Sequence, residues 1–231
     1  MSVAAHSCIV CVIVFRLRYS CEEYTNRGTL LAVALLVLFG GTTTAQLSAQ
    51  SGPEKGGHEL QFWTGGGHGL NGVTSDTGVW NAGVRYGWVL TNPHGPGFLS
   101  GRFEYAVDAV PIFWVFEPGR TAYGVGLDPF ALKWNLATDG RVVPYFELGG
   151  GTLFTNIQVP AGTSRVNFTS SAALGAHVLR GKLNWSAEVR YMHISNAGLS
   201  SVNPGINTLQ LRLGVGWFTH GTRDSHKRTG R

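Results

Sequence analysis

The sequence predicts an all-β chain that folds into an eight-stranded antiparallel transmembrane β-barrel of the outer-membrane type. Segments in which apolar and polar residues alternate follow one another along the chain, which is the period expected of β-strands with one apolar face. Charged residues make up only 13% of the chain, and it holds 33 glycines. No amphipathic stretch of helical period interrupts this pattern, so a meander of strands is the favoured architecture.

The alternating segments are the expected strands, and sequences rich in glycine and proline separate them. The breaks include NPHGPG at 92–97, EPGR at 117–120 and TDG at 138–140. Segments of about ten residues are long enough to cross a bilayer as tilted strands. The expected strands lie near residues 58–67, 79–91, 98–116, 121–136, 142–156, 164–180, 183–195 and 207–218.

The alternation also indicates which face of each strand points outward. In residues 207–217, leucines and other apolar residues occupy one face, and Thr208, Gln210 and Arg212 occupy the other. The polar faces carry single charges of both signs, whereas the solvent face of a soluble sandwich would carry many lysines and glutamates. Apolar residues outside and paired charges inside are typical of an outer-membrane barrel. A soluble lipocalin-like barrel would be apolar inside. The expected inward charges are Glu59, Glu104, Asp108, Glu147 and Glu188, with Arg85, Arg102, Lys133, Arg190 and Arg212.

The two ends of the chain differ in composition from the expected barrel. Residues 29–41 are apolar without a charge, follow Arg27 and precede small residues. This is the pattern of a secretory signal peptide, and the run is shorter than the ~20 residues of a membrane helix. The expected organisation is a leader and signal peptide at 1–45, a short linker at 46–57, the barrel at 58–218 and a polar basic tail at 219–231.

Cysteine and charge narrow the range of cofactors and partners. Cys8, Cys11 and Cys21 all lie in the expected leader, so the mature chain would hold neither a disulfide nor a thiolate metal site. No metal or other cofactor is expected. The net charge is +5, but outside the tail no cluster of lysine and arginine suggests nucleic acid as a partner. A membrane surface that carries phosphate groups is a better match than nucleic acid for this moderately positive net charge.

The most informative motif is YMHISNAG at 191–198, followed by NPGIN at 203–207. His193 and Ser195 are two residues apart on an expected strand, so they share a face. A general base beside a hydroxyl is the core of an acyl-transfer site. Both residues continue an apolar face and are therefore expected to point outward. For an even number of strands with both termini in the periplasm, the loop after Ser195 lies on the outer side.

The pattern HxSNAG followed by NPG resembles the lipid A 3-O-deacylase (PagL-like, acyloxyacyl hydrolase) family. The likeness is specific within 188–207 and extends as strand rhythm over 58–218. It implies an eight-stranded outer-membrane barrel that removes the ester-linked acyl chain at position 3 of lipid A. It also implies that His193 is the base and Ser195 the nucleophile, with Asn203 and Asn196 at the oxyanion site.

One position departs from the family pattern. The resemblance implies a glutamate twelve residues after the serine, and this chain has Asn207 there. An asparagine can accept a hydrogen bond from the histidine ring and orient it, but it supplies no negative charge to offset the imidazolium. Asn207 is therefore expected to be the orienting member of the triad.

These observations lead to a functional hypothesis with two alternatives. The expected activity is a serine esterase of the bacterial outer membrane that acts on lipid A of lipopolysaccharide, with its active site facing the outer leaflet. The barrel is expected to lie in outer-membrane lipid. Nucleic acid is not an expected partner, and the resemblance suggests a homodimer. The alternatives are a non-enzymatic barrel of the same fold with a decayed site, and a phospholipase-type esterase.

Overall fold

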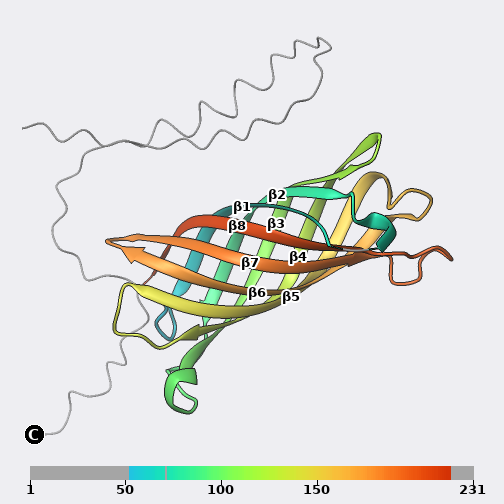
Figure 1. The fold of residues 1–231 in the computed structure, drawn as a ribbon. Helices are drawn as coiled ribbons and strands as arrows, with labels where there is room; N and C mark the ends of the chain where they lie inside the picture. Colours follow the sequence, from blue (N-terminus) through green and yellow to red (C-terminus); the bar gives the residue numbers. More distant parts are fainter. Residues whose placement is uncertain (1–51, 71, 220–231) are drawn as a thin grey trace, which may run out of the picture. The chain divides into compact units, whose positions relative to one another are not determined.

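The structure, a computed structural model, describes residues 52–70 and 72–219. These residues form a closed barrel of eight strands, in which each strand pairs antiparallel with its sequence neighbours and the last closes onto the first (Figure 1). The predicted fold class is confirmed. The expected leader at 1–45, residues 46–51 of the expected linker and the tail from residue 220 lie outside the described residues. Within the described ranges, no helix is long and apolar enough to cross a membrane.

The strands follow the predicted ones closely, and two of them coincide with the prediction. The expected segments 164–180 and 183–195 are β6 and β7, and the other strand ends differ from the prediction by a few residues. Two short 3-10 turns, η1 (Gly72–Thr74) and η2 (Gly97–Leu99), lie in the connections. The strands are β1 (His58–Gly69), β2 (Gly78–Val89), β3 (Gly101–Glu117), β4 (Arg120–Leu136), β5 (Val142–Val159), β6 (Ser164–Arg180), β7 (Leu183–Ser195) and β8 (Ile206–Phe218).

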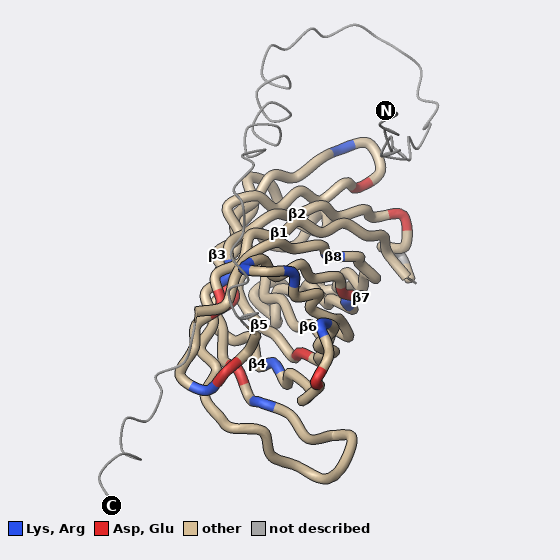
Figure 2. Tube along the Cα trace, turned by 90° about the vertical axis from the view of Figure 1, so that its left-hand side faces the viewer, with Lys and Arg blue, Asp and Glu red and all other residues tan. Residues whose placement is uncertain are grey.

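The outer surface of the barrel is apolar and its interior is polar, as the alternation predicts. On β8, Leu209 and Leu211 point outward and are 47% and 55% exposed, whereas Thr208, Gln210 and Arg212 are buried. Figure 2 shows acidic and basic positions interspersed among the strands. An apolar outer wall around a polar interior is the arrangement that suits a barrel surrounded by lipid.

Ion pairs cross the interior and connect opposite walls of the barrel. Arg85 on β2 binds Asp108 on β3 at 2.7 Å and Glu147 on β5 at 2.5 Å. Arg190 on β7 binds the same Glu147 and also Glu188, each at 2.6 Å. A buried charge is costly unless it is paired and hydrogen-bonded, so these side chains hold one another in place.

A second polar cluster fills the interior closer to the start of β1. Lys133 on β4 lies 2.7 Å from Glu59 and 3.6 Å from Glu104. Asn184 on β7 donates a hydrogen bond to Glu59 at 2.9 Å, and Asn135 donates one to Glu104 at 2.7 Å. Arg212 on β8 joins the first cluster, 3.3 Å from Asp108 and from Glu188. His177 on β6 joins the second cluster through a 2.9 Å hydrogen bond to Asn184.

Two charged residues differ from the sequence prediction. Arg102 was expected inside, but it is only half-buried at the start of β3 and lines a pocket with Glu54, Asp139 and Arg141. Asp128 was not expected inside, yet it is buried and accepts a hydrogen bond from Thr169 at 3.0 Å. The pairing of β4 with β5 shifts register next to it, between Leu127 and Phe130. Such a bulge changes the phase of the alternation, so a strict two-residue period misplaces residues beyond it.

Replacing Arg85 with methionine is expected to destabilise the barrel by about 3–5 kcal/mol, because Asp108 and Glu147 would each lose a buried partner. Reversible urea unfolding of the refolded protein in detergent would measure the change. Arg165→Met is the matched control, since Arg165 is exposed at the start of β6. Equal stability of the two variants would show that the interior network contributes little.

Candidate active site

His193 and Ser195 lie on the outer face of β7, close to its end. The outward residues before them on this strand are exposed, with Trp185 at 50% and Tyr191 at 41%. Their inward neighbours are buried, and these include Glu188 and Arg190 of the interior network. The ion pairs inside the barrel therefore fix the strand that carries the candidate base and nucleophile outside it.

Asn207 stands directly across from His193 on β8. The Nδ1 atom of His193 lies 2.7 Å from Oδ1 of Asn207. Because an amide oxygen accepts hydrogen bonds, Nδ1 carries the proton and Nε2 is left as the basic nitrogen. This is the tautomer that a general base next to a serine requires.

Tyr191 adds a second donor to the same amide oxygen. Its hydroxyl donates a hydrogen bond to Oδ1 of Asn207 at 2.6 Å. Within the described part of the chain, His193 and Ser195 share no hydrogen bond with each other. In unliganded enzymes such contacts are often long and shorten when substrate binds.

Gly205 forms the wall against which the imidazole rests. A Cβ atom at this position would lie 2.8 Å from Cε1 of His193, and the residue has a φ of +68°. Its carbonyl accepts a hydrogen bond from Oγ1 of Thr74 at 3.0 Å, and Leu70 donates from its backbone N–H to the carbonyl of Asn207 at 2.9 Å. The connection between β1 and β2 thus holds the start of β8 against the histidine.

Asn196 and Asn203 organise the loop between β7 and β8. Asn196 is buried; its Nδ2 donates to the carbonyl of Val202 at 2.9 Å, and its Oδ1 accepts from the N–H of Gly198 at 2.9 Å. Its backbone N–H donates to Oδ1 of Asn203 at 3.2 Å. Asn203 is exposed, so its Nδ2 is the amide end that faces away from these loop contacts.

The neighbouring strand β6 places a second hydroxyl beside the histidine. Ser170 pairs directly with His193, and Phe168 pairs with Ser195. Side chains that face each other across two antiparallel strands have Cβ atoms about 4.5–5.5 Å apart. Ser170 is exposed on the same outer surface, so the register offers its hydroxyl as an alternative to that of Ser195.

An apolar groove lies on the outer surface on the side of the barrel that carries β7 and β8. Ala187 lies on the same face of β7 as His193, about 20 Å along the strand at ~3.3 Å per residue. The lining of the groove combines small side chains with aromatic and aliphatic ones. The groove is lined by Phe62, Trp63, Thr64, Val178, Trp185, Ser186, Ala187, Leu213, Gly214 and Val215.

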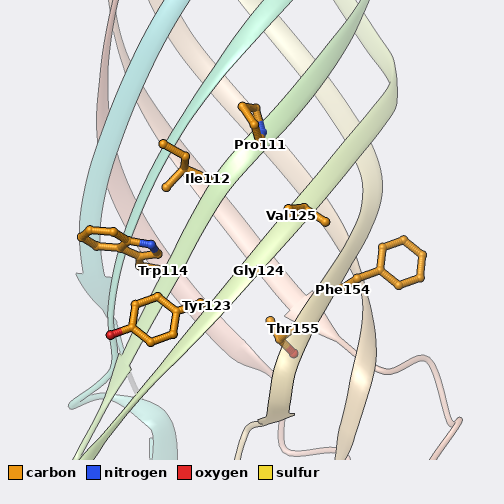
Figure 3. A pocket seen from close by; sticks show the side chains of 8 residues that line it. All are labelled: Pro111, Ile112, Trp114, Tyr123, Gly124, Val125, Phe154 and Thr155. Atoms are coloured by element: carbon orange, nitrogen blue, oxygen red, sulfur yellow. The ribbon is translucent and has the colours of Figure 1, made fainter. Parts of the chain in front are cut away.

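Another apolar groove lies on strands β3, β4 and β5 (Figure 3). Its lining holds no histidine, lysine or carboxylate, so no general base accompanies the hydroxyls of Tyr123 and Thr155. It is lined by Pro111, Ile112, Trp114, Tyr123, Gly124, Val125, Phe154 and Thr155.

Among the described residues, no three His, Cys, Asp or Glu side chains are grouped so that they could hold a metal ion.

Sequence reasoning singled out His193, Ser195 and Asn207, and the structure brings them together on one surface. It missed Tyr191, Gly205, Ser170 and Thr74. Tyr191 and Gly205 belong to the motifs YMHISNAG and NPGIN, so the sequence held a signal for them. Ser170 and Thr74 are remote in the chain, and only the strand register and the loop contacts place them at the site.

A comparison with known families identifies the family of the chain. A model of the family described as "Lipid A 3-O-deacylase (PagL)" matches residues 80–216, which is more than half of the chain. The chain belongs to the lipid A 3-O-deacylase (PagL) family. The matched range holds all five residues that the sequence singled out at the site, and the suspected family is confirmed.

A solved structure supports the PagL fold. The structure titled "Crystal structure of the outer membrane enzyme PagL" is similar with a TM-score of 0.51 at 20% identity, over 67% of this chain and 97% of that chain. At this identity the likeness bears on the fold alone. No curated protein matches the chain.

Proposed function

We propose that this chain is a serine esterase of the bacterial outer membrane that hydrolyses the 3-O-linked acyl chain of lipid A. One observation carries the proposal: in a member of the PagL family, an imidazole whose Nδ1 is held at 2.7 Å by Asn207 shares an outward strand face with Ser195. An outward site on a lipid-facing wall is reached by a membrane lipid and not by a soluble ester.

The chemistry follows from the roles that these residues can play. Ser195 Oγ attacks the ester carbonyl while Nε2 of His193 takes the hydroxyl proton. The tetrahedral intermediate then collapses, the 3-hydroxyl of lipid A leaves with the proton from His193, and the acyl group stays on Ser195. Water, deprotonated by His193, attacks the acyl-enzyme and releases the fatty acid.

Asn203 supplies the side-chain donor for the oxyanion in this proposal. Its Oδ1 is held by the backbone N–H of Asn196, so its Nδ2 is the end available to a negative oxygen. A donor fixed before the reaction stabilises developing charge without reorganising. Asn196 contributes indirectly, because its buried amide ties together the loop that carries Asn203.

The surroundings of the site fit a lipid substrate. The apolar groove at Ala187 lies about 20 Å from His193 along the same outward face of β7. The exposed side chains of Val189 and Tyr191 lie between them, so a fatty acyl chain can lie along this face. We place the site at the outer leaflet, with residues 1–45 directing export and the mature barrel beginning after them. A homodimer remains a prediction.

The two alternatives differ in what they require of Asn207. A decayed site would leave no reason for His193 to keep an orienting partner, yet the contact between His193 and Asn207 is short. A phospholipase-type esterase would use the same residues on another lipid, so only the products distinguish it. Mass spectrometry of lipid A and of phospholipids from the same cells separates all three.

Ser195→Ala is expected to reduce lipid A deacylation by about a thousandfold or more, because the attacking oxygen is removed. Mass spectrometry of lipid A from expressing cells would show the 3-O-acyl chain retained. Ser170→Ala is the matched control, since Ser170 presents a hydroxyl to the same histidine from β6. Loss of activity in the control with full activity in Ser195→Ala would assign the nucleophile to Ser170.

Asn207→Asp places a carboxylate oxygen where Oδ1 now accepts from His193. The added charge stabilises the imidazolium, so we expect kcat to rise by about tenfold or more and the acidic limb of the rate profile to move to higher pH. Rates of the refolded protein measured between about pH 5 and pH 9 would record both changes. An unchanged acidic limb would contradict His193 as the base.

Gly205→Ala is expected to lower deacylation by about a hundredfold, because the new Cβ would displace the imidazole from its position. Gly198→Ala is the matched control: Gly198 also has a positive φ, +86°, but a Cβ there meets nothing within 4 Å. Activity is measured on lipid A, with heat-modifiable migration to verify folding. Equal losses in both variants would attribute the effect to backbone strain in the loop.

A further inference from the structure

We propose that Tyr191 is a positioning residue that holds the amide oxygen of Asn207 toward the ring of His193. This inference rests on the proposed function, since it assigns a task within the same site. Tyr191 itself would touch neither the ester nor the reacting oxygen. It would act through Asn207 on the protonation state of His193.

The arrangement of β7 and β8 brings the three side chains together. Tyr191 is two residues before His193 on the outward face of β7, and Asn207 faces His193 from β8. The oxygen of Asn207 accepts from the Tyr191 hydroxyl at 2.6 Å and from Nδ1 of His193 at 2.7 Å. Both bonds have the short lengths of well-made hydrogen bonds.

The need for such a residue follows from the asymmetry of an amide. A carboxylate offers an acceptor oxygen on either side, whereas an asparagine amide has an acceptor end and a donor end. If the Nδ2 end of Asn207 faced the ring, Nδ1 would have to accept and the ring proton would move to Nε2. His193 could not then take the proton from Ser195.

A phenol favours the productive orientation because it donates more strongly than it accepts, its oxygen lone pair being delocalised into the ring. With Tyr191 donating, the oxygen end of Asn207 is the end that satisfies both neighbours. At the lipid-facing surface, water competes less for these groups, so each hydrogen bond counts for more than in solvent.

The aromatic ring of Tyr191 has a second, ordinary explanation. Tyrosines on the outer wall of a barrel often anchor it at the membrane interface, and Tyr191 is 41% exposed there. Anchoring depends on the ring and is largely retained by phenylalanine. A phenylalanine substitution therefore separates the positioning role of the hydroxyl from the anchoring role of the ring.

The decisive experiment is a double-mutant cycle on lipid A hydrolysis by the refolded full-length barrel. Tyr191→Phe is expected to lower kcat by about three- to tenfold, the worth of one neutral hydrogen bond, with little change in KM. In an Asn207→Ala background the same change should cost nothing further, because Tyr191 acts only through Asn207. Tyr123→Phe, on the outward face of β4 and 53% exposed, is the matched control and should leave kcat unchanged.

Two kinetic outcomes would overturn the inference. One is an unchanged kcat in Tyr191→Phe. The other is an equal loss in the Asn207→Ala background, which would mean that the hydroxyl acts on the substrate directly.

Nitrogen and proton NMR of the histidine rings tests the same inference without turnover. The Nδ1–H signal of His193 should exchange faster with water in Tyr191→Phe than in the unsubstituted protein, and an unchanged exchange rate overturns the inference. A protein that shows the faster exchange but never deacylates lipid A would refute the proposed function alone. Failure of the inference about Tyr191 and failure of the proposed function therefore give different results.

Discussion

The pairing of charges inside the barrel is the interaction on which the rest of the structure depends. Arg85, Arg190 and Arg212 are all buried, and each lies within 3.3 Å of one or more buried carboxylates. Eight strands enclose a space only as wide as the side chains that fill it, so an unmatched charge would have neither water nor a partner. These ion pairs allow a polar interior, and a polar interior lets the apolar side chains face outward.

The same network sets the register of the strands that carry the site. Glu188 and Arg190 on β7 and Arg212 on β8 point inward, while Tyr191 and His193 point outward from the same strand. Because side chains alternate, a slip of one residue would exchange the two faces of a strand. The ion pairs resist that slip, and the cross-strand pair of His193 with Asn207 follows from the register they keep. The alternation of side chains along each strand thus accounts both for the ion pairs inside the barrel and for the position of the candidate site outside it.

This alternation also explains how much the sequence could predict. The strands, their outward faces and the common surface of His193, Ser195 and Asn207 all follow from a two-residue period and one hairpin. The inward position of Asp128 was not predicted, because a register shift in β4 changes the phase of the inward and outward alternation. Arg102 was wrongly predicted to lie inside, because it is at a strand end that the barrel encloses only partly. The hydrogen bond from Tyr191 and the contact of Gly205 with the ring depend on side-chain reach and loop conformation, which periodicity does not encode.

An amide in place of an acid at position 207 has a physical rationale that concerns the membrane. A carboxylate on an apolar outer wall is costly because little water is present to solvate it, whereas a neutral amide carries no charge and its oxygen accepts two hydrogen bonds. In the proposed mechanism the cost of an amide falls on the reaction, since Asn207 stabilises the tautomer of His193 but not its charge. A neutral orienter also loses the symmetry of a carboxylate and must be held in one orientation. In the role that we propose for it, Tyr191 meets that requirement, because its hydroxyl donates to the amide oxygen of Asn207 at 2.6 Å.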